Sequence, residues 1–214
     1  MNKIYEFPLG ALQTNCYIIE GDDKQAVVID PASSSEVLMF LNSKELTLGA
    51  IILTHGHFDH FAGVPELVRR TGCEVIGARL DEEMFKSAVK SWADFMPHIP
   101  FEPVSLDRSF ADGEEFTVCG LTFRAMGTPG HTAGCCMLFV GDVIFAGDTL
   151  FCGSIGRTDG YSASGAEMGR SLQKIAEIEG EYKIYSGHGD STMLSFEKDY
   201  NPYLFRYAHK GEII

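Results

Sequence analysis

Short runs of β-branched and aromatic residues alternate along the chain with polar, glycine-containing segments, and this pattern predicts short strands joined by turns. Residues 15–19 and 25–29 are two such runs, and the polar residues 20–24 between them predict a hairpin. A helix should follow from residues 33–35, where serines can cap an apolar face. The apolar run at residues 51–53 then predicts a buried strand.

The next predicted helix has signals at both of its ends. Pro65 stands in its first turn, and Gly72 closes it. Residues 74–76 then form another short β-rich run. The first half of the chain therefore alternates between strands and helices.

Residues 79–103 have a different character. Residues 81–90 predict a helix, whereas residues 92–103 mix aromatic residues with prolines that break regular structure. Such a stretch is typical either of a lid over a cleft or of a covering loop packed on the core. Both interpretations stay open on the sequence alone.

The second half of the chain predicts further short strands and two helices. One helix should begin at Ser162 or Ser164 and end at Gly180. A terminal helix is expected over residues 196–207, with an interruption at Pro202. The strands are expected at residues 115–118, 121–126, 136–140, 143–146 and 183–185.

Composition restricts the class of protein. With 214 residues and 45% hydrophobic content, the chain is expected to form a single domain over residues 1–214. Its 30 acidic and 17 basic residues give a net charge of −13, which argues against a nucleic-acid partner. We find no signal peptide, no segment long enough to span a bilayer, and no C-x-x-C pair among the six cysteines. A cytoplasmic monomer or homodimer without a membrane partner is therefore expected.

The strand at residues 51–53 runs into a loop dense in metal-ligand side chains. This loop holds His55, His57, Asp59 and His60 within six residues. In extended backbone the first three lean to one side, because they occupy alternate positions. Imidazole and carboxylate groups are ligands for zinc, iron or manganese, so the sequence predicts a metal site at the rim of the sheet.

Three later loops each present one more ligand-type side chain at the end of an apolar run. His131 sits in a turn with three glycines, Asp148 follows Gly147, and His188 stands between two glycines. Each is weak evidence alone, since a histidine near a glycine is commonly a turn residue. Together the four loops supply five histidines and two aspartates, which is the inventory for two metal ions that share one carboxylate.

These motifs resemble those of the metallo-β-lactamase superfamily. The letters THGHFDH at residues 54–60 match its T-H-x-H-x-D-H signature. GHT at 130–132, GD at 147–148 and SGHG at 186–189 match its later metal motifs in order. The chain is most similar to the short, single-domain subgroup of the glyoxalase II-like (hydroxyacylglutathione hydrolase-like) enzymes, over essentially its whole length.

The resemblance implies an α/β fold, a four-layer αββα sandwich with two divalent metal ions. Zinc is the expected metal, with iron or manganese as alternatives. The implied ligands are His55, His57 and His131 for the first ion, Asp59, His60 and His188 for the second, and Asp148 bridging both.

The implied reaction is hydrolysis of a small acyl thioester such as S-lactoylglutathione. Asp59 would act catalytically by orienting the nucleophile and accepting its proton. Phe151, Ser154 and Arg157 are expected to border the substrate. For Arg157 an ion pair with Asp159 is the competing interpretation.

Two features distinguish the chain from the glyoxalase II-like enzymes, and a third distinguishes it from true β-lactamases. It ends before the basic C-terminal domain with which authentic glyoxalase II grips glutathione, so weak binding of the thiol carrier is expected. Ser186 replaces a proline of the family motif, at a turn position that is not a ligand. The bridging Asp148, absent from true β-lactamases, argues against a drug-hydrolysing enzyme.

Three alternative functions stay open. A persulfide dioxygenase of similar fold would use one iron, held by His57, His131 and Asp148. An RNA-processing nuclease of the same fold conflicts with the net charge of −13. A non-enzymatic binding protein on the same scaffold conflicts with the presence of all seven ligand-type side chains.

Overall fold

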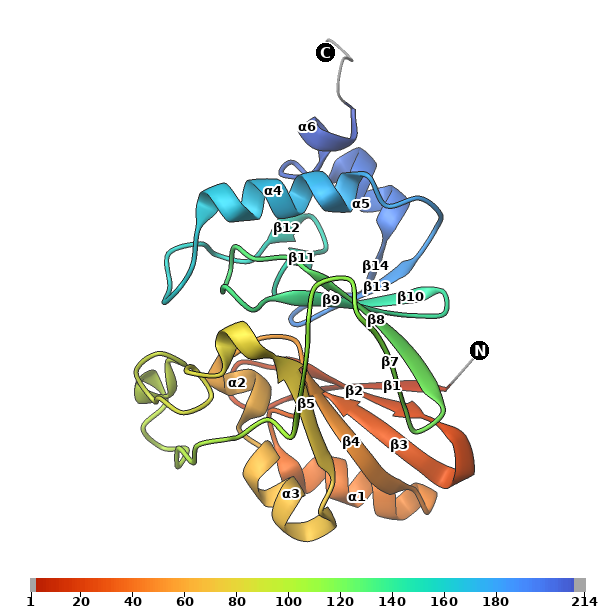
Figure 1. The fold of residues 1–214 in the computed structure, drawn as a ribbon, viewed down its shortest axis with the longest axis vertical. Helices are drawn as coiled ribbons and strands as arrows, with labels where there is room; N and C mark the ends of the chain where they lie inside the picture. The colour runs from red at the N-terminus through yellow and green to blue at the C-terminus, as the bar shows by residue number, and fades with distance from the viewer. Residues whose placement is uncertain (1–2, 210–214) are drawn as a thin grey trace.

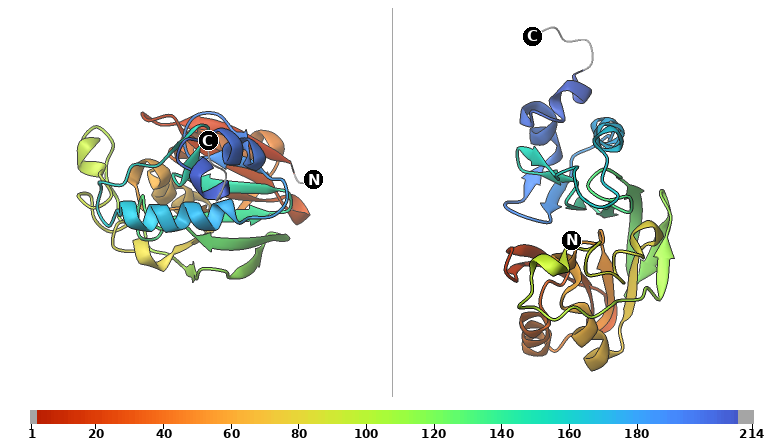
Figure 2. Two further views of the ribbon diagram at one scale, coloured as in Figure 1. Left: turned by 90° about the horizontal axis from the view of Figure 1, so that it is seen from above. Right: turned by 90° about the vertical axis from the view of Figure 1, so that its left-hand side faces the viewer.

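Two six-stranded sheets face each other in the computed structural model of the chain, which describes residues 3–209 (Figure 1). Helices α1 and α3 cover the outer face of the first sheet, and α4 and α5 cover that of the second (Figures 1 and 2). This layer order confirms the predicted αββα sandwich. The ends of the predicted domain, residues 1–2 and 210–214, lie outside the described residues.

The N-terminal half of the chain forms the first sheet, with its strands in chain order. Strands β1 to β3 are antiparallel neighbours, whereas β3 to β6 run parallel. The helices α1 (Ser34–Lys44) and α3 (Val64–Thr71) make the crossovers between parallel strands. The strands are β1 (Ile4–Leu9), β2 (Thr14–Glu20), β3 (Gln25–Ile29), β4 (Thr47–Leu53), β5 (Glu74–Ala78) and β6 (Arg108–Phe110).

The second sheet has the order β14-β13-β10-β9-β8-β7. Its strands β10 and β13 are parallel, so their carboxyl ends meet at one edge. A two-stranded ribbon, β11 (Leu150–Phe151) with β12 (Ser154–Ile155), follows β10. The other elements are β7 (Glu115–Val118), β8 (Leu121–Gly127), β9 (Cys136–Val140), β10 (Val143–Gly147), α4 (Gly165–Ala176), β13 (Lys183–Ser186), β14 (Thr192–Met193), α5 (Leu194–Tyr200) and α6 (Phe205–Ala208).

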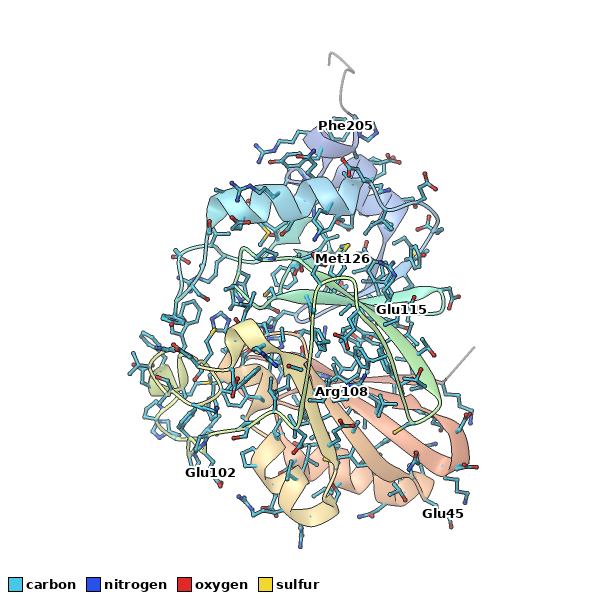
Figure 3. The ribbon with its side chains drawn as sticks, in the orientation of Figure 1. Glu45, Glu102, Arg108, Glu115, Met126 and Phe205 are labelled. Carbon is cyan, nitrogen blue, oxygen red and sulfur yellow. The ribbon has the colours of Figure 1, made fainter. Side chains whose placement is uncertain are left out.

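Side-chain alternation along each central strand builds the core on both faces of the sheets. In β4, Ile51 and Leu53 pack with the helix side of the first sheet, whereas Ile52 packs between the two sheets. Met126 belongs to the third cluster, between the second sheet and α4 (Figure 3). Full burial of an aliphatic side chain of this size stabilises the fold by about 1.5–3 kcal/mol. The strand that carries the metal-type loop is therefore fixed from both sides.

Most predicted elements are confirmed, some with shifted ends. The predicted strands match β2 to β5, β7 to β10 and β13, and Ser164 caps α4 by accepting a hydrogen bond from the backbone N–H of Glu167. Helix α4 ends at Ala176, before the predicted Gly180. The terminal helix begins at Leu194 and is interrupted around Pro202, as predicted.

The predicted helix at residues 81–90 is wrong. A short 3-10 helix covers Arg79–Asp81, and turns follow it up to residue 90. The carboxylate of Asp81 accepts hydrogen bonds from backbone groups of two other loops, and Met84 and Phe85 are both buried, so tertiary contacts override the local helical preference.

No helix among residues 3–209 is both long and apolar enough to cross a membrane.

Candidate metal centre

The seven predicted ligand side chains converge at one edge of the sandwich. Each of the four segments that carry them follows the carboxyl end of a strand: β4, β8, β10 or β13. Asp59 and His60 lie in the short helix α2 (Phe58–Phe61), so the extended backbone expected for this segment does not reach Asp59. The polar atoms of the seven side chains approach within 2.8–3.6 Å of one another. The structure therefore brings together all seven residues, although metal ligation by them remains a prediction.

Three buried histidines form the first cluster. The Nδ1 atom of His57 lies 3.1 Å from Nε2 of His55 and 2.8 Å from Nε2 of His131. Burial, together with the neighbouring imidazoles, lowers the pKa of His57 to about 3 and holds the pKa of His55 well below its usual range. Neutral imidazoles with converging nitrogen atoms are ligands for a divalent cation.

Asp59, His60 and His188 form the second cluster. Oδ2 of Asp59 lies 3.5 Å from Nε2 of His60 and 3.3 Å from Nε2 of His188. Burial alone would raise the pKa of Asp59, but His60, His188 and a hydrogen bond from Thr14 outweigh it and hold that pKa well below its usual range. Asp59 is therefore ionised at neutral pH.

Asp148 lies between the two clusters. Its carboxylate oxygens are 3.5 Å from Nε2 of His131, 3.4 Å from Nε2 of His60 and 3.6 Å from Nε2 of His188. Burial opposes ionisation, yet the surrounding histidines lower the pKa of this carboxyl. This placement is that of a carboxylate able to bridge two cations.

Unpaired polar atoms in the cluster test whether the site fits metal ions. Nε2 of His60 and Oδ1 of Asp148 are buried without a hydrogen-bond partner among residues 3–209. Leaving such groups unsatisfied costs about 1–3 kcal/mol each, more if they are charged. Cations held by the two clusters would satisfy both atoms, so the residues fit a pair of metal ions.

Asp30, which the sequence did not single out, supports the centre from behind. It accepts hydrogen bonds from the backbone N–H and the hydroxyl of Thr54, and its Oδ2 lies 2.8 Å from Nδ1 of His60. It is 2% exposed. A carboxylate behind a ligating histidine fixes the ring and its tautomer. The only sequence signal was its place at the end of a strand, before Pro31.

Asp81 joins two of the ligand loops. It is fully buried and accepts hydrogen bonds from the backbone N–H of Gly56 (2.9 Å), the backbone N–H of Gly134 (2.7 Å) and the hydroxyl of Thr132 (2.6 Å). One carboxylate therefore ties the loop of His55 to the loop of His131.

The three predicted substrate contacts differ in their surroundings. The ring of Phe151 lies 6.2 Å from that of His188, at the edge of the centre. Ser154 lies in β12, where its backbone carbonyl accepts a hydrogen bond from Asn201. Arg157 pairs with Asp159 through two contacts of 2.6 and 2.9 Å, which was the competing interpretation. Contact of these residues with substrate remains a prediction.

The segment at residues 79–103 packs partly on the core. Phe85 and Ala93 are buried in the cluster on the helix side of the first sheet, and Phe101 contacts that cluster. Trp92 instead lies against His57, with ring centroids 4.4 Å apart. The packing agrees with a covering loop, and opening of the segment as a lid stays a prediction.

Replacing His131 by alanine should remove one of two bound ions and most hydrolytic activity while the protein stays folded. His131 lies in the turn after β8 and outside the strands, so the sheet should survive its loss, whereas the first cluster would keep only two of its three nitrogens. Metal content per chain and circular dichroism measure the two effects. His98→Ala, at an exposed histidine outside the site, is the matched control. Two ions at full occupancy in the His131 variant would show that this histidine is not a ligand.

A histidine and aspartate cluster at the strand ends of an αββα sandwich defines a metallohydrolase-like protein. The chain belongs to the metallo-beta-lactamase superfamily, whose sequence profile matches residues 9–188. The expected resemblance to this family is confirmed.

Similar proteins extend over nearly the whole chain. A hydroxyacylglutathione hydrolase (GloC) of Haemophilus influenzae is 34% identical over 205 residues, which are 92% of this chain and 95% of the relative. The crystal structure of the BLEG-1 B3 metallo-beta-lactamase has a TM-score of 0.87 at 31% identity, with 94% of this chain and 99% of that one covered. TTHA1623 in a di-iron-bound form has a TM-score of 0.84 at 32% identity, with 94% and 100% covered. The names of these relatives differ in substrate, so similarity fixes the superfamily and leaves the substrate open.

Proposed function

We propose that this chain is a dinuclear metal-dependent hydrolase of small acyl thioesters, with hydroxyacylglutathiones such as S-lactoylglutathione as its substrate class. The observation that carries the proposal is Asp148, a buried carboxylate within 3.6 Å of histidines from both clusters. Seven converging donors exceed what a single ion needs. Two divalent ions held there would supply a water of lowered pKa and a Lewis acid for the acyl carbonyl.

Asp59 takes the proton in this proposal. Its low pKa keeps it ionised, and Thr14 donates a hydrogen bond of 2.7 Å to its Oδ2, which fixes the carboxylate. An oriented, ionised carboxylate at the reaction centre can hold the attacking water and receive its proton. The departing thiolate is a good leaving group, so the reaction needs no strong general acid.

A relative that matches over nearly its whole length supports this substrate class. The Haemophilus influenzae relative named a hydroxyacylglutathione hydrolase has nearly the same length, since the match covers 95% of it. That name therefore does not depend on a large additional domain. We expect zinc in both positions. Iron is the alternative, because the similar protein TTHA1623 has been crystallised in a di-iron-bound form.

The decisive experiment compares three reactions on the same purified protein. Thiol release is followed on a panel of acyl thioesters, oxygen uptake on glutathione persulfide, and ring opening on a chromogenic cephalosporin, with metal counted per chain. We expect thiol release with two ions per chain. Oxygen uptake without thiol release and with one iron would favour the dioxygenase, and cephalosporin opening alone would favour a β-lactamase.

Arg157→Ala should raise KM for glutathione thioesters about tenfold and leave kcat within a few-fold, if the guanidinium binds a substrate carboxylate. In the structure this group is held by Asp159, so binding must exchange one carboxylate for another. Asp159→Ala is the matched variant, because it frees the arginine and should not raise KM. Equal rises of KM in both variants would show that the ion pair acts only by shaping the loop.

A further inference from the structure

Four histidines in the centre are buried, and three of them have a protein group behind the ring at hydrogen-bonding distance. Partners of this kind fix the orientation of a ligating imidazole and typically change metal affinity by about 10- to 100-fold. The pairs are Nδ1 of His55 with the hydroxyl of Thr54 at 3.1 Å, Nδ1 of His60 with Asp30 at 2.8 Å, and Nδ1 of His131 with the carbonyl of Arg157 at 2.8 Å.

His57 is the exception among these four. It turns Nδ1 toward His55 and His131, and its Nε2 is buried without a hydrogen-bond partner in the described part of the chain. Within the described residues, the ring nitrogens of His57 contact only the other two histidines of the cluster, so no group outside the cluster fixes the plane of this ring by a hydrogen bond. Another contact has to orient it.

The indole of Trp92 covers one face of that imidazole. The two rings are 4.4 Å apart at an interplanar angle of 10°, a close stack. The guanidinium of Arg157 lies 4.8 Å from the indole centroid, and a Cβ at Gly160 would come within 2.5 Å of the indole. The indole is thus held in place by neighbours other than His57.

The backbone also directs Trp92 toward the centre. Its φ of 64° lies in the left-handed region, which a bulky side chain rarely adopts. The preceding carbonyl, that of Ser91, accepts a hydrogen bond of 2.9 Å from the backbone N–H of Phe58. A strained residue anchored directly beside a ligand loop points to a role in the site.

We propose that Trp92 is the positioning residue of His57, and that its stack does for this ring what hydrogen bonds do for the other three. The inference rests on the proposed function, because it assumes that His55, His57 and His131 hold a metal ion. A bound cation draws electron density from the imidazole, and the electron-rich face of indole attracts the resulting positive ring. The stack should therefore favour the metal-bound state of the three-histidine cluster and leave the second cluster unaffected.

Full-length protein dialysed against a series of buffered free zinc concentrations tests this inference. We expect the wild type to hold two ions per chain. Trp92→Ala should lose one of them at a free zinc concentration about tenfold higher than the wild type does, with the other ion unchanged. Trp92→Phe, which can still stack, should restore most of the affinity, and Phe95→Ala, at an exposed aromatic residue of the same segment, should behave like the wild type.

The outcomes separate the inference from the proposed function. A wild type that binds no metal would end the proposed function itself. A wild type with two ions, together with Trp92→Ala retaining both at the same free zinc, would overturn the role of Trp92 alone. So would an equal weakening of both ions, or a failure of Trp92→Phe to restore affinity. If Trp92→Ala does not fold, Gly160→Ala displaces the indole with Trp92 still present, and retention of both ions there would equally overturn the inference.

Discussion

Replacing Asp148 by alanine should lower kcat/KM for thioester hydrolysis by at least about 100-fold, which is the largest loss we expect from any single substitution at the centre. Removing a group that hydrogen-bonds to a metal ligand typically lowers metal affinity or activity about 10- to 100-fold. Asp148 faces the ion sites directly, so its loss should cost at least as much. Its carboxylate also lies within 3.6 Å of histidines from both clusters. Without it, each ion loses a ligand and the repulsion between two cations is no longer offset.

Two variants isolate the charge and the position of this carboxylate. Asp148→Asn keeps the shape but removes the charge, so it should also lose metal. Asp142→Ala changes an exposed aspartate at the other end of the same β10 region and should retain two ions and full activity. Metal content and thiol release are measured on all three. An Asp148→Ala protein with two tightly bound ions would refute the bridging role.

The sequence predicted the layered fold because its signals are local and repeated. Strands β3 and β9 are short and mainly apolar, β7 alternates polar and apolar residues, and turn residues bound them, so their limits could be read directly. Strand β1 was missed because it is a half-exposed edge strand interrupted by Pro8. Strands β11, β12 and β14 have only two residues each, which is too short for any periodic pattern.

The convergence of the ligand loops was predictable for a related reason. Each loop follows a strand end and carries a histidine or aspartate among glycines, and the resemblance supplied the way they combine. The groups behind the ligands were not predictable from spacing. Asp30 reaches His60 over 30 residues, and Trp92 lies 35 positions from His57. Nothing in the chain near either residue indicates that partner.

Asp81 shows most directly how tertiary contacts override a helix predicted from the local sequence. The sequence placed it at the start of a helix, where an aspartate is a common feature of the first turn. In the structure its side chain turns away to Gly56 and Gly134, and the predicted helix does not form. The hydrogen bonds that prevent the predicted helix also hold the loop of His55 against the loop of His131.

Asp81→Ala should therefore lower the free energy of unfolding by about 3 kcal/mol or more and also weaken metal binding. The substitution leaves two backbone N–H groups and the hydroxyl of Thr132 buried without their acceptor, at about 1–3 kcal/mol each. Some of that loss is offset because the variant no longer buries a carboxylate. Asp94→Ala, an exposed aspartate in the same segment, should change stability by less than about 0.5 kcal/mol.

The pH dependence of this difference provides a second measurement. Burial raises the pKa of Asp81 above its ordinary value, and the three hydrogen bonds only partly counteract it. A carboxyl with a raised folded-state pKa contributes most to stability below its unfolded pKa of about 3.9, and the contribution falls as the pH rises through the folded-state pKa. Urea unfolding at several pH values should thus show the gap between wild type and Asp81→Ala widest at acidic pH and narrower at neutral pH. A gap that widens toward neutral pH would mean that the hydrogen bonds to the ionised carboxylate outweigh its burial, and a gap near zero throughout would remove Asp81 as the link between the two loops.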